Sequence, residues 1–478
     1  MTIREQAIAG IKWTAGGRLA AQAITWGITL IVMRLLHPED YGLLAMATVF
    51  LAFMLMLSEA GLAPALVQKQ ELSDTALQQI FAIIIIINLA LCAILNLLAP
   101  LIAEFFDDER LISIIRVLSL QFFTVIAITI PQALLYRELK FKQLSLIDFI
   151  AAIIGSLVTL ILAYLNYGVW ALIYGSLLVN VYKMIVFNIL TPFYIRPKFS
   201  LDGMRSFLTF GGNITLTRIL WYFYNQVDVM IVGKVLGKEI LGYYSVAMYL
   251  ASLPVQRISS VIGQVAFPVF TKVQEDQLRF RNFVLKSIRI LSLIAFPVLW
   301  GISSIAYELV FLFLGEKWLT AVLPLQLLTL VMPFRVIANF LPSATDALGH
   351  PEIALKNVLL SAVLMPIALL IGVQWGITGV ALVWVTFFPI ILFINYHRSL
   401  VVIGLSLKDL LHVLIPIMAS GIGMYFVVWG VDLLLGNNLN KLLELAIMII
   451  SGALVYYGLT IKFNKAGYLE FIQLFKKN

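Results

Sequence analysis

Charged side chains occur inside stretches of this sequence that are otherwise apolar enough to cross a bilayer. A charge near the membrane centre costs about 2.5–3.5 kcal/mol even on a lenient scale, so such residues face a polar cavity or a partner. They are therefore the first candidates for a functional site. The residues in question are Arg18, Arg116, Arg218, Arg257, Arg335, Glu59 and Asp228.

Polar residues recur around these charges at spacings of three or four, which places them on one face of a helix. Four expected helices carry such a stripe, near residues 12–36, 206–234, 240–270 and 321–347. We expect these faces to line a polar chamber near the middle of the membrane. The stripes comprise Thr14, Arg18, Gln22, Thr25 and Thr29; Arg218, Trp221, Tyr222, Asn225 and Asp228; Tyr249, Ser252, Gln256 and Ser259, with Arg257 beside them; and Arg335, Asn339, Ser343 and Asp346.

The chemistry that such a chamber suits is the binding of an anion. A guanidinium group binds phosphate or carboxylate through two parallel hydrogen bonds, and arginine outnumbers acid in the stripes. The residues expected to bind substrate are Arg18, Arg218, Arg257 and Arg335, with Gln22, Asn225 and Trp221 beside them. Those expected to bind a coupling ion are Asp228 and Glu59.

A structural role is the alternative for each of these charges. Arg218 can pair with Asp228, Glu59 can pair locally, and the long side chain of Arg116 can reach the end of its helix. The equivalent places of Arg18 and Arg218 in two sequence repeats, described below, favour a functional role for these two.

Signatures of catalysis and of metal binding are absent from the sequence. It contains no His-Glu-x-x-His, Gly-x-Ser-x-Gly or Gly-x-x-x-x-Gly-Lys pattern, and its one cysteine, Cys92, excludes an internal disulfide. The pair Asp107-Asp108 suits the start of the following helix better than a metal site. We expect no catalytic residue, metal site, cofactor or nucleic-acid partner.

The composition is that of an integral membrane protein. Hydrophobic residues make up 62% of the 478 residues and charged residues only 12%, whereas soluble domains average about 25% charged residues. The apolar runs have the length of about 20 residues that a membrane-crossing helix needs. About fourteen such helices are predicted, near residues 12–36, 41–66, 77–102, 111–135, 143–165, 168–192, 206–234, 240–270, 283–310, 321–347, 353–374, 377–396, 409–430 and 441–461.

The loops between these helices carry a strong charge asymmetry. With the N-terminus in the cytoplasm, about 21 basic loop residues lie inside and about six outside. This bias also explains the net charge of +8. It predicts a multi-pass protein of the bacterial inner membrane with both termini in the cytoplasm.

The sequence also repeats itself at an offset of 200 residues. The matching pairs include Arg18 and Arg218, Leu36 and Leu236, Glu39 and Glu239, Gly42 and Gly242, and Ala47 and Ala247. The offset spans six helices, an even number, so the repeats are parallel and related by an axis along the membrane normal. The predicted fold is all-α: six-helix bundles over 1–195 and 196–400, then an additional helix pair and a basic cytoplasmic tail over 401–478.

An ordered set of short motifs runs through about the first 360 residues. The motifs are Met1-Thr2-Ile3-Arg4-Glu5, Gly10-Ile11-Lys12-Trp13, Tyr41-Gly42-Leu43, Ser58-Glu59-Ala60-Gly61, Arg137-Glu138-Leu139-Lys140-Phe141, Gly242-Tyr243-Tyr244, Phe267-Pro268-Val269-Phe270 and Gly315-Glu316-Lys317-Trp318. This set resembles the WzxC-type polysaccharide flippases of the multidrug/oligosaccharidyl-lipid/polysaccharide exporter superfamily. The resemblance implies a proton or Na⁺ gradient as the energy source.

The resemblance implies a twelve-helix core, often with two added helices. It also implies a transport function: undecaprenyl-diphosphate-linked oligosaccharides would move from the cytoplasmic to the periplasmic leaflet by alternating access, for exopolysaccharide, capsule or O-antigen assembly. Glu59 departs from the family, which commonly carries Asp before the glycine. We expect a monomer that associates with a polysaccharide polymerase or glycosyltransferase.

Two alternatives lie within the same superfamily: a lipid II-type peptidoglycan precursor flippase and a multidrug antiporter. An antiporter would carry more acid than base in its membrane spans, unlike this sequence. A membrane-bound glycosyltransferase or polymerase would need a large catalytic loop, whereas the predicted loops are short.

Overall fold

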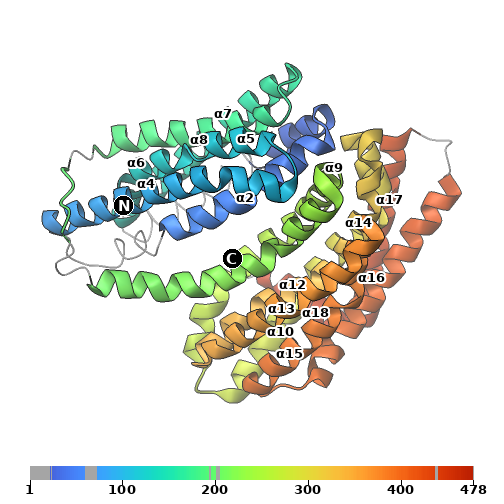
Figure 1. Ribbon diagram of the computed structural model, residues 1–478. Coiled ribbons are helices and arrows are strands. Elements are labelled where there is room, and N and C mark those ends of the chain that lie inside the picture. The colour runs from blue at the N-terminus through green and yellow to red at the C-terminus, as the bar shows by residue number, and fades with distance from the viewer. Residues whose placement is uncertain are drawn as a thin grey trace. The chain divides into compact units, whose positions relative to one another are not determined.

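The fold is helical, as the composition predicts. The computed structural model describes residues 22, 24–59, 73–192, 195–200, 205–435 and 440–476, and within these ranges it contains helices and no strand (Figure 1). Packing divides the chain into two compact units, residues Met1–Gly242 and Tyr243–Asn478. The predicted bundle limits rest on the sequence repeat rather than on packing, and they stay a prediction.

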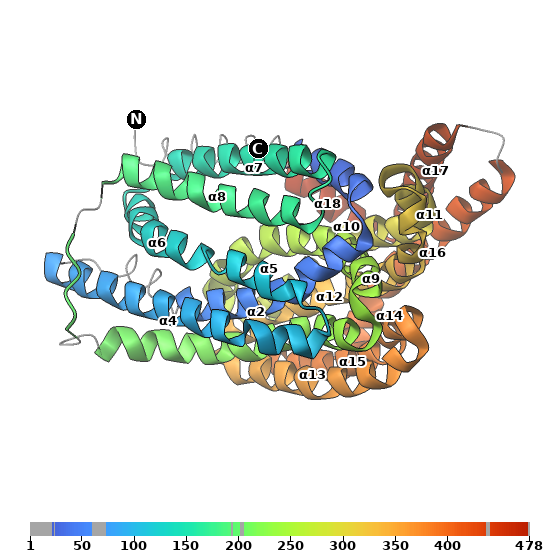
Figure 2. The same ribbon diagram turned by 45° about the horizontal axis from the view of Figure 1, so that its top comes forward.

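Helices that run along one another build the first unit. α7 and α8 lie side by side in both ribbon views (Figures 1 and 2), and α6 packs against α8. A short apolar helix, Ile24–Leu35, precedes them. The remaining helices of this unit are α2 (Pro38–Glu59), α4 (Asp74–Phe106), α5 (Arg110–Leu118), α6 (Gln121–Arg137), α7 (Phe141–Tyr164), α8 (Val169–Leu190) and the first part of α9 (Arg205–Val273).

The second unit contains the rest of α9 and the C-terminal helices. α16 and α17 pack along one another, and α10 packs against both α12 and α16. The elements of this unit are α10 (Gln277–Ser304), α11 (Ala306–Leu309), η1 (Val310–Leu314), η2 (Glu316–Ala321), α12 (Val322–Ala347), α13 (Pro351–Gly372), η3 (Val373–Trp375), α14 (Gly376–Thr386), α15 (Phe388–Ile403), α16 (Leu407–Leu435), α17 (Lys441–Phe463) and α18 (Lys465–Lys476).

Local sequence explains where the long helix α4 begins and ends. The Ser73 side chain accepts a hydrogen bond from the amide of Ala76 at 3.2 Å, which caps the first turn. At the other end Asp107 adopts the left-handed conformation, with φ 56°, and its amide bonds back to the last turn. The helix therefore stops beside a short acidic connection to α5.

Glycines divide two long helical stretches where the sequence predicts loops. α9 runs for 69 residues, but Gly237 has φ 79° and ψ 179° and separates it into two helices. This break falls between the predicted spans 206–234 and 240–270. Likewise Gly376, with φ 68°, separates α13 from α14, at the predicted interruption between 353–374 and 377–396. Both positions need a backbone conformation that glycine adopts readily.

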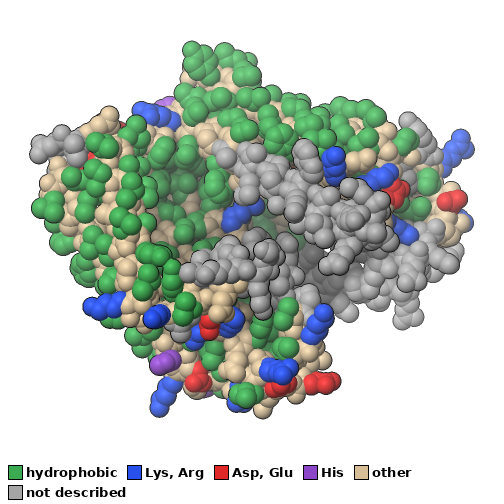
Figure 3. Space-filling view, turned by 180° about the vertical axis from the view of Figure 1, so that it is seen from behind, with side chains coloured by type: hydrophobic (Ala, Val, Ile, Leu, Met, Phe, Trp, Pro, Cys, Tyr) green, Lys and Arg blue, Asp and Glu red, His purple; other side chains and the backbone are tan. Residues whose placement is uncertain are grey.

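The helices have the length and surface of a membrane protein. Ten stretches within the described ranges are long and apolar enough to cross a bilayer, one of them the 53-residue Pro351–Ile403, which exceeds a single crossing of about 20 residues. Large apolar side chains cover wide areas of the face shown in Figure 3, and Leu97 and Leu434 are 77% and 86% exposed. An all-helical integral membrane fold is confirmed, whereas the count of fourteen stays a prediction.

Candidate functional site

The four predicted substrate-binding arginines differ in how far the structure places them. Arg18 lies outside the described residues, and Arg218 belongs to α9 but its side chain is also outside them. Arg257 is exposed on the second part of α9, and Arg335 is half-buried on α12. The arrangement of all four around one chamber therefore stays a prediction.

Arg335 is held by an aromatic side chain. Its guanidinium carbon lies 5.3 Å from the centre of the Trp384 ring, which is a cation–π contact between α12 and α14. The Trp384 indole donates a hydrogen bond to the Tyr244 hydroxyl at 3.0 Å, and both of these residues are buried. This chain of contacts fixes the ring on which the arginine rests, so that its planar group is oriented before any anion binds.

Arg257 lies two helical turns after Tyr249 on the same part of α9. The Tyr249 side chain is 39% exposed, and Ser252 donates a hydrogen bond to the Tyr249 carbonyl at 3.0 Å. Tyr249 and Arg257, two residues of the predicted stripe, are thus both exposed on this helix of the second unit.

The predicted polar residues on the first part of α9 share one helix face. The Asn225 amide donates to the Trp221 carbonyl at 2.7 Å, one turn earlier, and Trp221 is 55% exposed. The neighbouring Tyr222 instead ties α9 to α2, because its hydroxyl donates to the Val49 carbonyl and its ring lies 5.8 Å from that of Phe53. Tyr222 is therefore structural, whereas a ligand-binding role for Trp221 and Asn225 stays a prediction.

Gln22 is placed on the helix that precedes α2. Thr25 donates to the Gln22 carbonyl at 3.1 Å, and Thr29 donates to the Thr25 carbonyl at 2.8 Å. Hydroxyl groups on an apolar helix are commonly satisfied by such bonds to the preceding turn. The predicted stripe of this helix is therefore helical from Gln22 onward.

The predicted ion-coupling residues are an aspartate and a glutamate on different helices. Asp228 is 4% exposed, and its carboxylate accepts a hydrogen bond from the Val229 amide at 2.9 Å among other interactions. Glu59 ends α2, and its side chain lies outside the described residues. Buried carboxylates such as Asp228 are rare in membrane helices and commonly functional.

A second polar stripe, on α4, went unrecognised in the sequence. Asn88 is fully buried and accepts a hydrogen bond from Ser58 at 2.6 Å, and Asn96 donates to Ser119 at 2.8 Å. Cys92 is half-buried between these two asparagines. The spacing of four residues from 88 to 92 to 96 was the available signal, but these side chains carry no charge.

A cluster of charged side chains joins α2, the α4–α5 connection and α9 within the first unit. Arg110 contacts Glu39 at 2.5 Å and Asp108 at 2.7 Å, and Lys238 contacts the same two carboxylates at 3.0 and 2.6 Å. Lys234 lies 2.6 Å from Asp107. Hydrogen bonds from Arg110 hold the pKa of Asp108 well below its ordinary range. Asp108 also accepts the Arg110 amide at the start of α5, at 3.1 Å, as the capping prediction requires.

Three carboxyl groups gather near the end of α16 in the second unit. The oxygens of Glu308, Asp432 and Glu444 lie within 4.8 Å of one another, a spacing that could hold a metal ion. The ammonium group of Lys441, however, lies 2.9 Å from Glu444. The cluster thus carries its own cation, and the geometry does not call for a metal.

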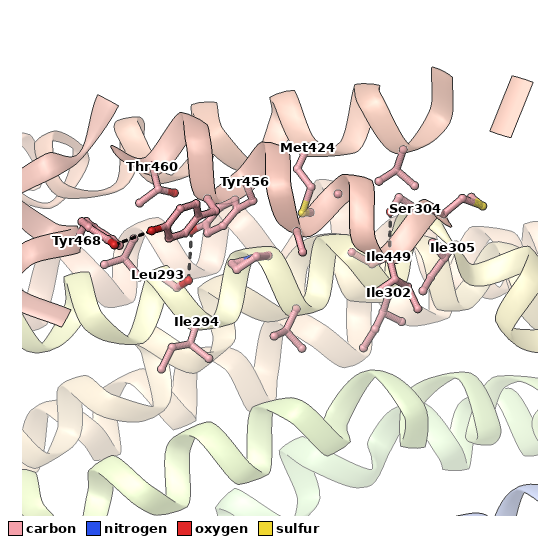
Figure 4. Close-up of a pocket in the computed structure, with 18 residues that line it drawn as sticks. Leu293, Ile294, Ile302, Ser304, Ile305, Met424, Ile449, Tyr456, Thr460 and Tyr468 are labelled. Atoms are coloured by element: carbon pink, nitrogen blue, oxygen red, sulfur yellow. Dashed lines mark hydrogen bonds between the residues drawn. The ribbon is translucent and has the colours of Figure 1, made fainter. Parts of the chain in front are cut away.

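An apolar cavity of about 740 Å³ lies between α10, α16, α17 and α18 (Figure 4). Tyr456 donates to the Leu293 carbonyl at 3.2 Å, and the hydroxyls of Tyr457 and Tyr468 lie 2.7 Å apart at one end. Most of the other lining groups are aliphatic, among them Ile294, Ile302, Ile305, Met424 and Ile449. Such a wall suits hydrocarbon and does not recognise an anionic head group.

Comparisons with known proteins agree on one group of relatives. The sequence profile of a family described as polysaccharide biosynthesis protein matches residues 31–323. The lipopolysaccharide biosynthesis protein WzxC of Escherichia coli strain K12 is 28% identical over 389 residues, which cover 80% of this chain and 78% of WzxC. The teichuronic acid biosynthesis protein TuaB of Bacillus subtilis strain 168 is 27% identical over 474 residues, 96% of each chain.

Solved structures of membrane transporters share the fold. The lipid II flippase MurJ in an inward closed conformation superposes with a TM-score of 0.74 at 18% identity, over 95% of this chain and 99% of MurJ. A multidrug resistance MATE family transporter of the MOP superfamily, in an inward-facing conformation, superposes with a TM-score of 0.61 at 15% identity. The superposition covers 80% of this chain and 94% of the transporter. The predicted superfamily fold is confirmed.

Proposed function

Because this chain belongs to the polysaccharide biosynthesis protein family, we propose that it is a flippase for lipid-linked oligosaccharides. It moves undecaprenyl-diphosphate-linked repeat units from the cytoplasmic to the periplasmic leaflet of a bacterial inner membrane, for exopolysaccharide, capsule or O-antigen assembly. The observation that carries this proposal is the family match over a multi-pass helical protein with arginines inside its apolar spans.

The arginines bind the anionic part of the substrate. A diphosphate or an acidic sugar pairs with guanidinium groups through two hydrogen bonds each. Arg335 is suited to this role because it is a cation inside an apolar helix and Trp384 supports one face of its planar group. Arg18, Arg218 and Arg257 act with it, while Gln22, Asn225 and Trp221 contact sugars by hydrogen bonds and stacking. The lipid tail stays in the bilayer along the apolar outer surface.

The cycle is one of alternating access, driven by an ion gradient. Asp228 and Glu59 bind a proton or Na⁺, and binding biases the protein toward one of its two conformations. The buried position of Asp228 supports this assignment, since protonation or a cation removes the cost of a buried charge.

Transport of polysaccharide precursors fits better than the two alternatives. MurJ and MATE proteins share the fold, but at 18% and 15% identity they support no choice of substrate. The relatives WzxC and TuaB, by contrast, are named for polysaccharide biosynthesis. We therefore keep the lipid II flippase and the multidrug antiporter as second candidates, and we assign no enzymatic step.

We propose that the termini lie in the cytoplasm, because the basic loop residues gather on that side. The protein works as a monomer, and a polysaccharide polymerase or glycosyltransferase on the same pathway associates with it.

Complementation tests this function. A strain that makes an acidic exopolysaccharide and lacks its own flippase receives this protein, and surface polymer and lipid-linked precursor are measured. Wild type should restore export, whereas Arg335→Ala should leave the precursor in the cytoplasmic leaflet at normal protein levels. Arg279→Ala is the matched control, because Arg279 is 80% exposed and pairs only with nearby Asp276 at 3.1 Å. Drug resistance without export, across acidic and neutral polymers, would favour the antiporter.

A further inference from the structure

The two sequence repeats approach each other very closely at one pair of helix starts. A Cβ atom on Gly42 would overlap the carbonyl oxygen of Lys238, and a Cβ atom on Gly242 would overlap the carbonyl oxygen of Pro38. Gly242 is the repeat mate of Gly42, and Lys238 is that of Pro38, at the same offset of 200 residues. The two contacts are therefore reciprocal, as contacts around a pseudo-twofold axis must be. This axis passes between the starts of α2 and of the second part of α9.

Charged side chains surround this close contact. Glu39, one residue after Pro38, accepts from both Lys238 and Arg110, and Asp108 is bound by the same two cations. Asp107 and Lys234 extend the cluster. The carboxylates and the cations of this cluster are equal in number, so it is electrically balanced while it stays closed.

The contact joins segments from both repeats at one side of the membrane. Pro38 and Glu39 begin α2, Asp108 follows α4, and Lys238 follows the bend at Gly237 in α9. In the orientation proposed above, all of these segments are extracytoplasmic. Alternating access requires that this side be closed whenever the cytoplasmic side is open.

We propose that the reciprocal glycine contact and the surrounding charge cluster form the outer gate of the transport path. This inference rests on the proposed function. The gate holds the starts of α2 and of the second part of α9 together while substrate enters from the cytoplasm. The two helix starts separate when the substrate leaves on the outer side.

The chemistry of the contact suits a gate that must open in every cycle. Ion pairs as exposed as these contribute little stability individually, because water solvates the separated charges well. The Glu39 side chain is 40% exposed and that of Lys238 is 35% exposed. The Asp108 side chain is only 9% exposed, but it keeps its ion pair with Arg110 when Lys238 moves away, so opening leaves no buried charge without a partner. Gly42 and Gly242 let the backbones of the two helix starts come into direct contact. This contact fixes the relative position of the two helices when the gate is closed.

Cysteine cross-linking tests the gate in the membrane. Cys92 is the one native cysteine, so Cys92→Ala gives a cysteine-free background. Glu39→Cys and Lys238→Cys are combined in it and treated with thiol cross-linkers of increasing length or with N-ethylmaleimide. We expect the short cross-linkers to join the two residues and to reduce export at least tenfold relative to the alkylated protein. A linker with a reducible bond should restore export when it is cleaved.

A matched pair controls for cross-linking as such. Asp148 on α7 and Lys183 on α8 also form an ion pair, at 2.7 Å, but both helices belong to the first sequence repeat and pack against each other. Cross-linked Asp148→Cys/Lys183→Cys protein should export as well as its alkylated form. Should the Glu39/Lys238 pair fail to fold, Asp107→Cys/Lys234→Cys probes the same gate at a more exposed place.

Two results would overturn the gate. Complete cross-linking with undiminished export would show that the helix starts need not separate. Absence of cross-linking in correctly inserted protein would show that they are not adjacent. Absence of export by the wild-type protein, in several host strains, would instead count against the proposed flippase function.

Discussion

At the scale of single residues, the candidate site depends on how each charge is supported. Arg335 rests on Trp384, which Tyr244 holds by a hydrogen bond. Asp108 is bound by Arg110 and Lys238. We expect Arg335 to bind substrate, whereas the contacts of Asp108 hold α2, α5 and α9 together. A charged side chain in this protein can therefore stabilise the fold without belonging to the proposed binding site.

Arg335→Lys should be tolerated only in part. Lysine keeps the charge over Trp384 but cannot form two parallel hydrogen bonds with one phosphate. Loss of one charge-assisted hydrogen bond of about 1.5 kcal/mol would lower the rate of transport roughly tenfold. The measurement is export by the variant at matched protein levels. Export equal to that of wild type would show that Arg335 does not bind the anion through two parallel hydrogen bonds.

Asp108→Asn should destabilise the protein by about 1 kcal/mol, because the Asp108 side chain is only 9% exposed but its partners Arg110 and Lys238 are solvated. Hydrogen bonds from Arg110 lower the pKa of Asp108 on folding, so the charged form stabilises the fold at every pH above the ordinary aspartate pKa of about 4. The difference in thermal unfolding temperature between wild type and variant should thus be constant from pH 6 to 8. It should shrink only in acid below that pKa. A difference that disappears near neutral pH would contradict this assignment.

At the scale of helices, the sequence predicts the long elements well. Runs of apolar residues place α4, α7 and α17 close to their observed limits, and Gly237 and Gly376 interrupt helices where loops are expected. The polar contacts of Asn88 and Asn96 could not be predicted, because uncharged amides inside an apolar helix give no sign of which neighbour will face them. Only packing decides that.

Gly42→Ala should destabilise the protein more than Gly458→Ala, because a Cβ atom on residue 42 would meet the Lys238 backbone rather than a movable side chain. A forced backbone shift of this kind costs about 1–3 kcal/mol. Gly458→Ala is the matched control, since nothing lies within 4 Å of a Cβ atom there. Thermal unfolding in detergent compares the two. Equal stability of both variants would show that the α2–α9 contact is looser than the structure has it.

At the scale of the whole molecule, the parallel sequence repeat predicts a pseudo-twofold axis, and the reciprocal contacts of Gly42 and Gly242 agree with that axis. Hydropathy predicts membrane crossing, and the charge bias predicts orientation. We expect the identity of the carried sugar to depend on contacts in the predicted chamber, one of whose arginines, Arg18, lies outside the described residues. Sequence and structure therefore agree on the architecture, while the site at its centre remains a prediction.

Orientation can be checked at two loops. In the Cys92→Ala background, Asp107→Cys should react with a membrane-impermeant maleimide in intact spheroplasts, because Asp107 is 73% exposed on the proposed outer side. Lys140→Cys, also exposed, should react only after the membrane is permeabilised, because the loop at Arg137 and Lys140 lies inside. The opposite pattern would reverse the proposed topology.

The central claim is that this protein itself moves a lipid-linked oligosaccharide across a bilayer. The most direct measurement uses purified protein in proteoliposomes that contain a fluorescent undecaprenyl-diphosphate oligosaccharide, with an impermeant quencher outside. With a proton or Na⁺ gradient, wild type should change the fraction of fluorophore that the quencher reaches, whereas Arg335→Ala should behave like empty liposomes. Equal redistribution by both proteins, or none by wild type under either gradient, would contradict the account.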